Sequence, residues 1–255
     1  MRQVPRHRSP TAVAVAVLAL LCGTCPVFVP LGGTPGTAAA SRAAGHQPRP
    51  SRHHVERPVI VPRSAWQAEG ADSVPGARYA PKVKAVVVHH TSTPNGYDCA
   101  TVPEILRGLY AGHAYGRHWD DIGYNFLVDS CGTIYEGRAG GAGRPVIGAH
   151  TKGFNEGTVG VAAIGTFTRG ETVPAPALEA IARLAAWKLD PDGPDPRGSV
   201  TLVSTNDEAR YPKGTSAVLP VIGGHRDGYP TDCPGAALYA ELAGIGARVA
   251  RLQKR

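Results

Sequence analysis

The feature that most constrains the fold is a run of mostly β-branched apolar residues that ends in two histidines. Residues 83–90 read VKAVVVHH, so three consecutive valines precede His89 and His90. A nearly continuous run of this kind is typical of a strand that is buried on both faces of a sheet. The two histidines then stand at the carboxyl end of a core strand, either as hydrogen-bonded structural residues or as part of a site.

Further strand-like and helix-like segments alternate along the rest of the chain. The expected strands are 124–129 and 133–137, which form a hairpin around Ser130-Cys131-Gly132, and then 158–167 and 217–225. The expected helices are 102–113, 176–189 and 235–252, and the Pro- and Gly-rich residues 190–220 are expected to form a surface excursion. This alternation predicts an α/β fold with a central mixed sheet flanked by helices. The first helix is expected to begin with a capping box made by Thr101 and Glu104.

The amino-terminal forty residues differ from the rest in composition. Three arginines lie within residues 1–8, an apolar segment follows at 11–21, and Ala38 and Ala40 supply the small residues of a cleavage site. These are the parts of a secretory signal peptide. The alternative, a retained membrane anchor, is disfavoured because the apolar segment is too short to span a bilayer.

We therefore expect a signal peptide at 1–40, a flexible linker at 41–56 and one folded domain at 57–255. Removing three arginines and no acidic residue with the signal lowers the formal charge from +7 to +4. A mildly basic exported protein suits an anionic cell wall, and we expect a monomer that is secreted, wall-associated and not stably inserted in a membrane. Nucleic acid is not an expected partner, because the chain has no run of Lys and Arg.

Cysteine usage points to one special thiol. Three of the five cysteines, Cys99, Cys131 and Cys233, follow the expected signal peptide. An odd number in an oxidising compartment is most simply explained by one disulfide and one cysteine with another role.

A second strand-like run, VIGGH, ends at His225, and Cys233 follows eight residues later. In α/β sheets, ligands gather beyond the carboxyl ends of the strands, so His225 is expected near His89 or His90. Each residue alone is more often structural. Together, however, two imidazoles and a thiolate match a tetrahedral zinc site that leaves one position for water.

Five motifs carry a resemblance to a known family. They are VVVHHT, HWDDIGYNFLVDSCGTIYEGR, GAHTKGFN, VGVAAIGTF and GHRDGYPTDCPG. In this order, over roughly residues 57–250, they resemble the peptidoglycan recognition proteins, which belong to the type 2 N-acetylmuramoyl-L-alanine amidases, and the style is similar to the secreted actinobacterial branch. The resemblance implies a zinc groove and a hydrolase that cleaves the amide between the lactyl group and L-alanine in peptidoglycan. The alternative is a non-catalytic peptidoglycan-binding module of the same fold.

The resemblance also implies roles for single residues. His89, His225 and Cys233 become the zinc ligands, and Tyr124 lies beside the metal, where a phenol orients water or donates to an oxyanion. Thr231 stands where phage-type amidases have lysine, and a hydroxyl stabilises less charge than an ammonium, so the oxyanion donor stays open. The residues expected to contact the stem peptide and muramyl sugar are His90, Thr91, His113, Arg117, His150 and Asn155.

With Cys233 assigned to zinc, Cys99 and Cys131 are the two cysteines left to form a disulfide. Two other zinc functions fit less well. A zinc protease of the common type needs a His-Glu-x-x-His helix, which the sequence lacks. A purely structural zinc site normally has four protein ligands, and three candidates are present.

Overall fold

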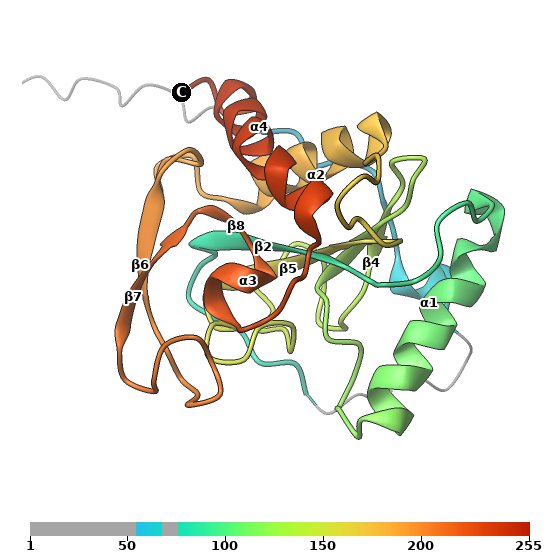
Figure 1. The fold of residues 1–255 in the computed structure, drawn as a ribbon, viewed down its shortest axis with the longest axis horizontal. Helices are drawn as coiled ribbons and strands as arrows, with labels where there is room; N and C mark the ends of the chain where they lie inside the picture. The colour runs from blue at the N-terminus through green and yellow to red at the C-terminus, as the bar shows by residue number, and fades with distance from the viewer. Residues whose placement is uncertain (1–54, 68–75) are drawn as a thin grey trace, which may run out of the picture. The chain divides into compact units, whose positions relative to one another are not determined.

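A six-stranded mixed sheet lies at the centre of the computed structural model, which describes residues 55–67 and 76–255 (Figure 1). The expected signal peptide and residues 41–54 of the expected linker lie outside the described residues. The strands are β1 (Ile60–Val61), β2 (Ala85–His90), β3 (Phe126–Val128), β4 (Ile134–Glu136), β5 (Thr158–Ala163) and β8 (Ile222–Gly224), in the order β1-β4-β3-β5-β2-β8. The pair β3–β4 is antiparallel, whereas β2 runs parallel to both of its neighbours, β5 and β8.

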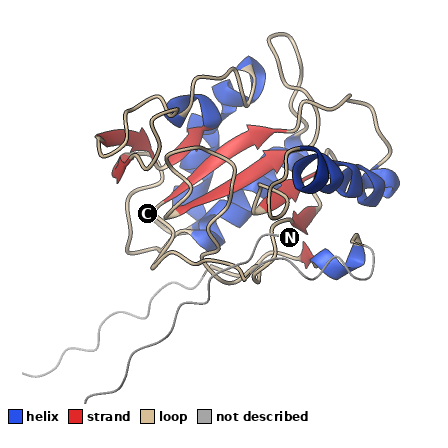
Figure 2. Cartoon of the chain, turned by 90° about the horizontal axis from the view of Figure 1, so that it is seen from below, coloured by secondary structure: helices blue, strands red, loops and turns tan. Residues whose placement is uncertain are grey.

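Helices cover both faces of this sheet, as Figure 2 shows. Helices α2 (Ala175–Lys188) and α4 (Ala236–Leu252) pack together on one face, which we call the α2/α4 face. Helix α1 (Val102–Ala111) covers the other, the α1 face, through a smaller apolar cluster that includes Leu106. The predicted mixed sheet flanked by helices is therefore confirmed.

Alternation along the strands assigns each side chain to one face. On β5, Val159 and Val161 belong to the core under α2 and α4, whereas Ala162 belongs to the cluster under α1. On β2, Val86 and Val88 point to the α2/α4 face. Because successive strand residues point to opposite faces, His89 lies on the α1 face and His90 on the α2/α4 face.

The run at 217–225 is not one strand, as the sequence predicted, but two. Strand β7 (Ser216–Pro220) pairs with β6 (Ser199–Val203) in a separate antiparallel ribbon, which accounts for the predicted surface excursion. The chain then passes through Val221 into β8, beside β2. Residue His225 begins the short helix α3 (His225–Gly228) directly after that strand.

The predicted capping box at the start of α1 is wrong, although the helix does begin at Val102. The Thr101 hydroxyl donates to the Asp98 carbonyl oxygen at 2.8 Å, and Glu104 pairs with Arg107. The reason is the preceding 3-10 turn, η2 (Cys99–Thr101), whose own cap is the Asp98 side chain. This turn gives the Thr101 backbone a conformation other than the extended one that a capping box needs.

A disulfide joins Cys99, in this turn, to Cys131 at the tip of the β3–β4 hairpin. A buried ion pair ties the chain at a second point: Arg63 Nη2 lies 2.7 Å from Asp121 Oδ1, which also accepts the Ile122 N–H. These contacts anchor the segment that leads to Tyr124. Among residues 55–67 and 76–255, none of the helices has both the length and the apolar character needed to cross a bilayer.

Candidate metal centre

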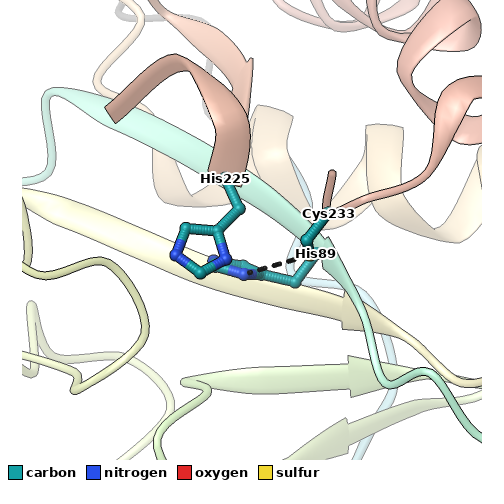
Figure 3. Close-up of side chains that lie close together, drawn as sticks. All are labelled: His89, His225 and Cys233. Carbon is teal, nitrogen blue, oxygen red and sulfur yellow. Dashed lines mark hydrogen bonds between the residues drawn. The ribbon is translucent and has the colours of Figure 1, made fainter. Parts of the chain in front are cut away.

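Three side chains of types that can ligate a metal converge at the carboxyl end of β2, as Figure 3 shows. His89 comes from the end of that strand, His225 from the start of α3 and Cys233 from the loop before α4. Their donor atoms all lie within 4.8 Å of one another. The rings of His89 and His225 are 4.5 Å apart between centroids, and Cys233 Sγ lies 3.7 Å from His89 Nδ1.

The parallel pairing of β2 with β8 explains this convergence. Val88 is in register with Gly224, so the next residues along the two strands, His89 and His225, emerge side by side. Cys233 is returned to this edge by backbone bonds, because Arg226 N–H donates to the Cys233 carbonyl oxygen at 3.0 Å. The His90 N–H in turn donates to Cys233 Sγ at 3.4 Å. Two strand ends and one loop therefore present three donors to one point.

Burial keeps the three donor groups neutral in the protein alone. Desolvation, followed by repulsion from His225, lowers the pKa of His89 well below its usual value. Burial also lowers the pKa of His225 to about 4 and raises the pKa of the Cys233 thiol to about 12. Neutral imidazoles are the form that binds metals, and a divalent cation would displace the thiol proton. The donor set thus fits a soft or borderline cation such as zinc.

Tyr124 lies against this cluster, on the same face of the sheet. Its ring centroid is 5.2 Å from that of His89 and 5.6 Å from that of His113. Burial, with the nearby Cys233, raises the pKa of the Tyr124 hydroxyl, while Arg117 opposes this shift. The phenol is therefore a hydrogen-bond donor throughout the neutral pH range.

Two of the predicted groove residues border the site on this side. His113 Nδ1 accepts the Gly123 N–H at 3.2 Å, and its ring packs in a tilted arrangement against Trp119, with 4.7 Å between centroids. The exposed Arg117 places its guanidinium carbon 5.4 Å from the same indole. Arg117 is close enough to Tyr124 to act on its pKa, and its charge is open to solvent.

Thr231 contacts the backbone of Cys233: its hydroxyl oxygen accepts the Cys233 N–H at 3.2 Å. The side chain of Arg226 donates to the Asp232 carbonyl, and Asp227 accepts from Gly224 N–H and the Tyr239 hydroxyl. Arg226 and Asp227 therefore brace the two segments that carry His225 and Cys233.

The structure places His150 directly beside His89, and its predicted contact with the muramyl peptide stays a prediction. Its ring is buried, with 6% of the residue exposed, and its Nδ1 lies 3.2 Å from His89 Nε2. It thus lies beside the candidate ligand, at the ring edge opposite the one that faces Cys233.

Three other predicted contact residues have structural partners. The His90 ring lies on the α2/α4 face, opposite His89, and its Nδ1 accepts the Phe167 N–H at 3.2 Å. Thr91 Oγ1 accepts the Gly165 N–H at 2.9 Å. Asn155 Oδ1 accepts the N–H groups of both His150 and Thr151, at 2.8 Å each, so it closes their loop. Thr91 and Asn155 stay partly exposed, whereas His90 is buried.

The sequence analysis missed three residues that contact the cluster. Thr151 Oγ1 lies 3.5 Å from His89 Nε2, and the Tyr229 ring stacks on His225 at 5.3 Å between centroids. Gly160 has no side chain where the His150 ring packs onto β5. A glycine inside a core strand is a signal of close approach, and it could have indicated this contact.

These features define an α/β domain with three candidate metal ligands at the carboxyl edge of its sheet. The N-acetylmuramoyl-L-alanine amidase family matches residues 79–236. Peptidoglycan-recognition protein LB of Drosophila melanogaster is 30% identical over 187 residues, which cover 72% of this chain and 67% of that protein. The N-acetylmuramoyl-L-alanine amidase of Sus scrofa is 33% identical over 193 residues, 72% of this chain but 27% of the pig protein.

Solved structures agree with these similarities. Drosophila PGRP-LB has a TM-score of 0.55 at 28% identity, covering 72% of this chain and 92% of that chain. Peptidoglycan recognition protein LE, solved with tracheal cytotoxin, a monomeric diaminopimelic acid-type peptidoglycan, has a TM-score of 0.53 at 32% identity, with coverage of 72% and 92%. The chain therefore belongs to the peptidoglycan recognition protein and type 2 N-acetylmuramoyl-L-alanine amidase family.

Proposed function

We propose that this protein is a secreted zinc-dependent N-acetylmuramoyl-L-alanine amidase. Its substrate is peptidoglycan, and the bond it cleaves is the amide between the lactyl group of N-acetylmuramic acid and L-alanine. The observation that carries the proposal is the meeting of His89, His225 and Cys233 within 4.8 Å, with the Tyr124 ring beside them. A module that only binds peptidoglycan has no need of three converging metal donors.

The two imidazoles and the thiolate would hold zinc, and the Tyr124 ring lies beside them. When bound, zinc supplies a Lewis acid and a water of lowered pKa. The protonated Tyr124 hydroxyl then donates to the carbonyl oxygen as negative charge develops on it. The Thr231 hydroxyl oxygen accepts the Cys233 N–H, and its proton would serve as a second donor. Arg117, exposed beside Tyr124, provides a cation for the carboxylates of the stem peptide.

The direct test is digestion of purified cell wall by the mature chain. Zinc-loaded protein should release fragments with new L-alanine amino termini, identified by mass spectrometry. Treatment with a chelator should abolish release, and added zinc should restore it. Cys233→Ala should lose both turnover and most of the bound zinc, because two imidazoles alone hold the metal weakly.

The Cys233→Ala variant can lose its metal without losing a disulfide that stabilises the fold. Cys131 and Cys99 form the disulfide, so Cys233 is the one free cysteine among the described residues, and its replacement leaves the disulfide intact. If zinc-loaded wild type binds wall fragments but releases no amino termini from several wall types, the alternative stands instead: a peptidoglycan-binding module of the same fold. Full zinc content in Cys233→Ala would contradict the ligand assignment.

A further inference from the structure

His150 lies between the candidate metal ligand His89 and the backbone of β5. Its Nδ1 is 3.2 Å from His89 Nε2 and 3.0 Å from Thr151 Oγ1. The opposite nitrogen of His89, Nδ1, faces Cys233 Sγ at 3.7 Å. The His89 ring therefore lies between the candidate metal ligand Cys233 at one edge and the His150 imidazole at the other.

This arrangement restricts the proton on His89. A neutral imidazole that offers its Nδ1 lone pair to a metal must carry its proton on Nε2. That Nε2–H needs an acceptor, since both rings are buried. His150 Nδ1 is the nearest acceptor, and accepting there puts the proton of His150 on its own Nε2.

We propose that His150 is a positioning residue that selects the Nε2–H tautomer of His89 and so directs Nδ1 to the metal. The inference rests on the proposed metal site and is independent of the substrate contact expected for His150 from the sequence. It gives His150 the role that a carboxylate or carbonyl oxygen has behind many metal-bound histidines.

Two features of the surroundings show that the His150 ring is held in one fixed position. A Cβ built on Gly160 would lie 2.4 Å from the Cδ2 and Cγ atoms of His150, and one on Gly148 would lie 2.5 Å from Cδ2. Asn125 ties this segment to the sheet, because its Oδ1 accepts the Gly160 N–H at 2.8 Å and its Nδ2 donates to the Val146 carbonyl at 2.9 Å.

The second nitrogen of His150 supports the same conclusion. Its Nε2 is buried and has no hydrogen-bond partner among the described residues. An unpaired buried N–H is destabilising, and an apolar residue of similar volume would remove that cost. Packing alone therefore does not account for an imidazole at this position, whereas an acceptor for His89 does.

The test compares zinc affinity, by competition with a chromophoric chelator, in wild type, His150→Leu and His150→Asn. Leucine fills the space but offers no acceptor, so zinc affinity should fall about 10- to 100-fold, the usual effect of losing the partner of a metal-bound histidine. Asparagine can put an oxygen near the place of Nδ1 and should recover most of the affinity. The thermal stability of the metal-free His150→Leu protein is measured alongside, so that a loss of packing can be told apart from a loss of zinc affinity.

A control variant and a spectroscopic readout complete the experiment. His118→Asn removes an exposed histidine outside the cluster and should bind zinc as wild type does. Long-range proton–nitrogen NMR of zinc-loaded wild type should show the His89 proton on Nε2 and the metal on Nδ1. This measurement needs no substitution at His150, so it decides the tautomer even if the leucine variant does not fold.

The outcomes separate this inference from the proposed function. If wild type binds no zinc, the proposed function fails and the inference fails with it. If wild type binds zinc but His150→Leu binds it equally well, or if the His89 proton is found on Nδ1, the inference alone is overturned. Lower stability of metal-free His150→Leu with unchanged zinc affinity would identify His150 as a structural residue.

Discussion

The two faces of the central sheet are built from different chemistry, although the same strands supply both. Under α2 and α4 the strands present Val86, Val88, Val159 and Val161, all with 1% or less of their surface exposed. Under α1 the carboxyl end of the sheet instead carries imidazoles, a phenol and a glycine. The first face holds a continuous apolar core, whereas on the second that core is interrupted by a polar cluster.

Adjacent residues illustrate the difference. His89 and His90 are both buried at the end of β2, yet the first lies within a cluster of polar side chains and the second accepts the Phe167 backbone N–H. We infer that stability resides mainly on the α2/α4 face and chemistry on the α1 face. Substitutions on the two faces should therefore have separable effects.

The largest effect on stability is expected from the α2/α4 face. Ile181, in α2, is fully buried, and Ile181→Ala should lower the free energy of unfolding by about 2–5 kcal/mol through lost burial and a cavity. Denaturant unfolding measures this change. Zinc bound per folded molecule should not change.

The control lies on the same helix. Arg183 makes an exposed ion pair with Glu179, and Arg183→Ala should change stability by less than about 0.5 kcal/mol. If Ile181→Ala instead removed zinc from the folded protein while leaving stability intact, the division between the faces would be wrong.

The next effect is expected on catalysis. Tyr124→Phe keeps the ring against His89 and removes the hydroxyl, so turnover should fall by about 10²-fold, the scale for losing one oxyanion donor. Affinity for wall fragments, measured by calorimetry, should stay nearly unchanged, because the lost interaction forms in the transition state.

Arg117→Ala is the matched contrast, since it should weaken fragment binding by removing an exposed cation beside the same tyrosine. Unchanged turnover in Tyr124→Phe would transfer the donor role to Thr231 or to the metal alone.

The smallest effect concerns two glycines on the α1 side. Gly108 lies on the exposed side of α1, where an added methyl group would meet no other part of the chain within 4 Å, so Gly108→Ala should stabilise the protein by about 0.5–1 kcal/mol. Gly160→Ala should destabilise it by about 1–3 kcal/mol, because the new methyl group overlaps the His150 ring. Thermal unfolding of the two variants gives the comparison, and equal shifts would show that His150 does not occupy a tight site.

Local patterns predicted most of the framework. The β-branched run before His89 predicted β2, the helical spacing of apolar residues predicted α1, α2 and α4, and the hairpin turn at Cys131 predicted β3 and β4. These predictions are confirmed because buried strands and amphipathic helices leave a short-range period in the sequence. The predicted capping box of α1 is wrong for a local reason as well: the Asp98 side chain caps the preceding turn by accepting the Ala100 N–H.

The candidate metal ligands could be predicted from the sequence, but the residues that pack around them could not. The sequence by itself determined that His89 and His225 each end a strand-like run and that Cys233 follows His225 by eight residues. Neighbouring strands of one sheet then bring these residues to the same edge. Only the tertiary structure decided that His90 points to the opposite face, that His150 lies beside His89, and that Gly160 makes room for it. The physical reason is that a side chain's partners are set by packing between segments far apart in the chain, and composition and periodicity carry no record of them.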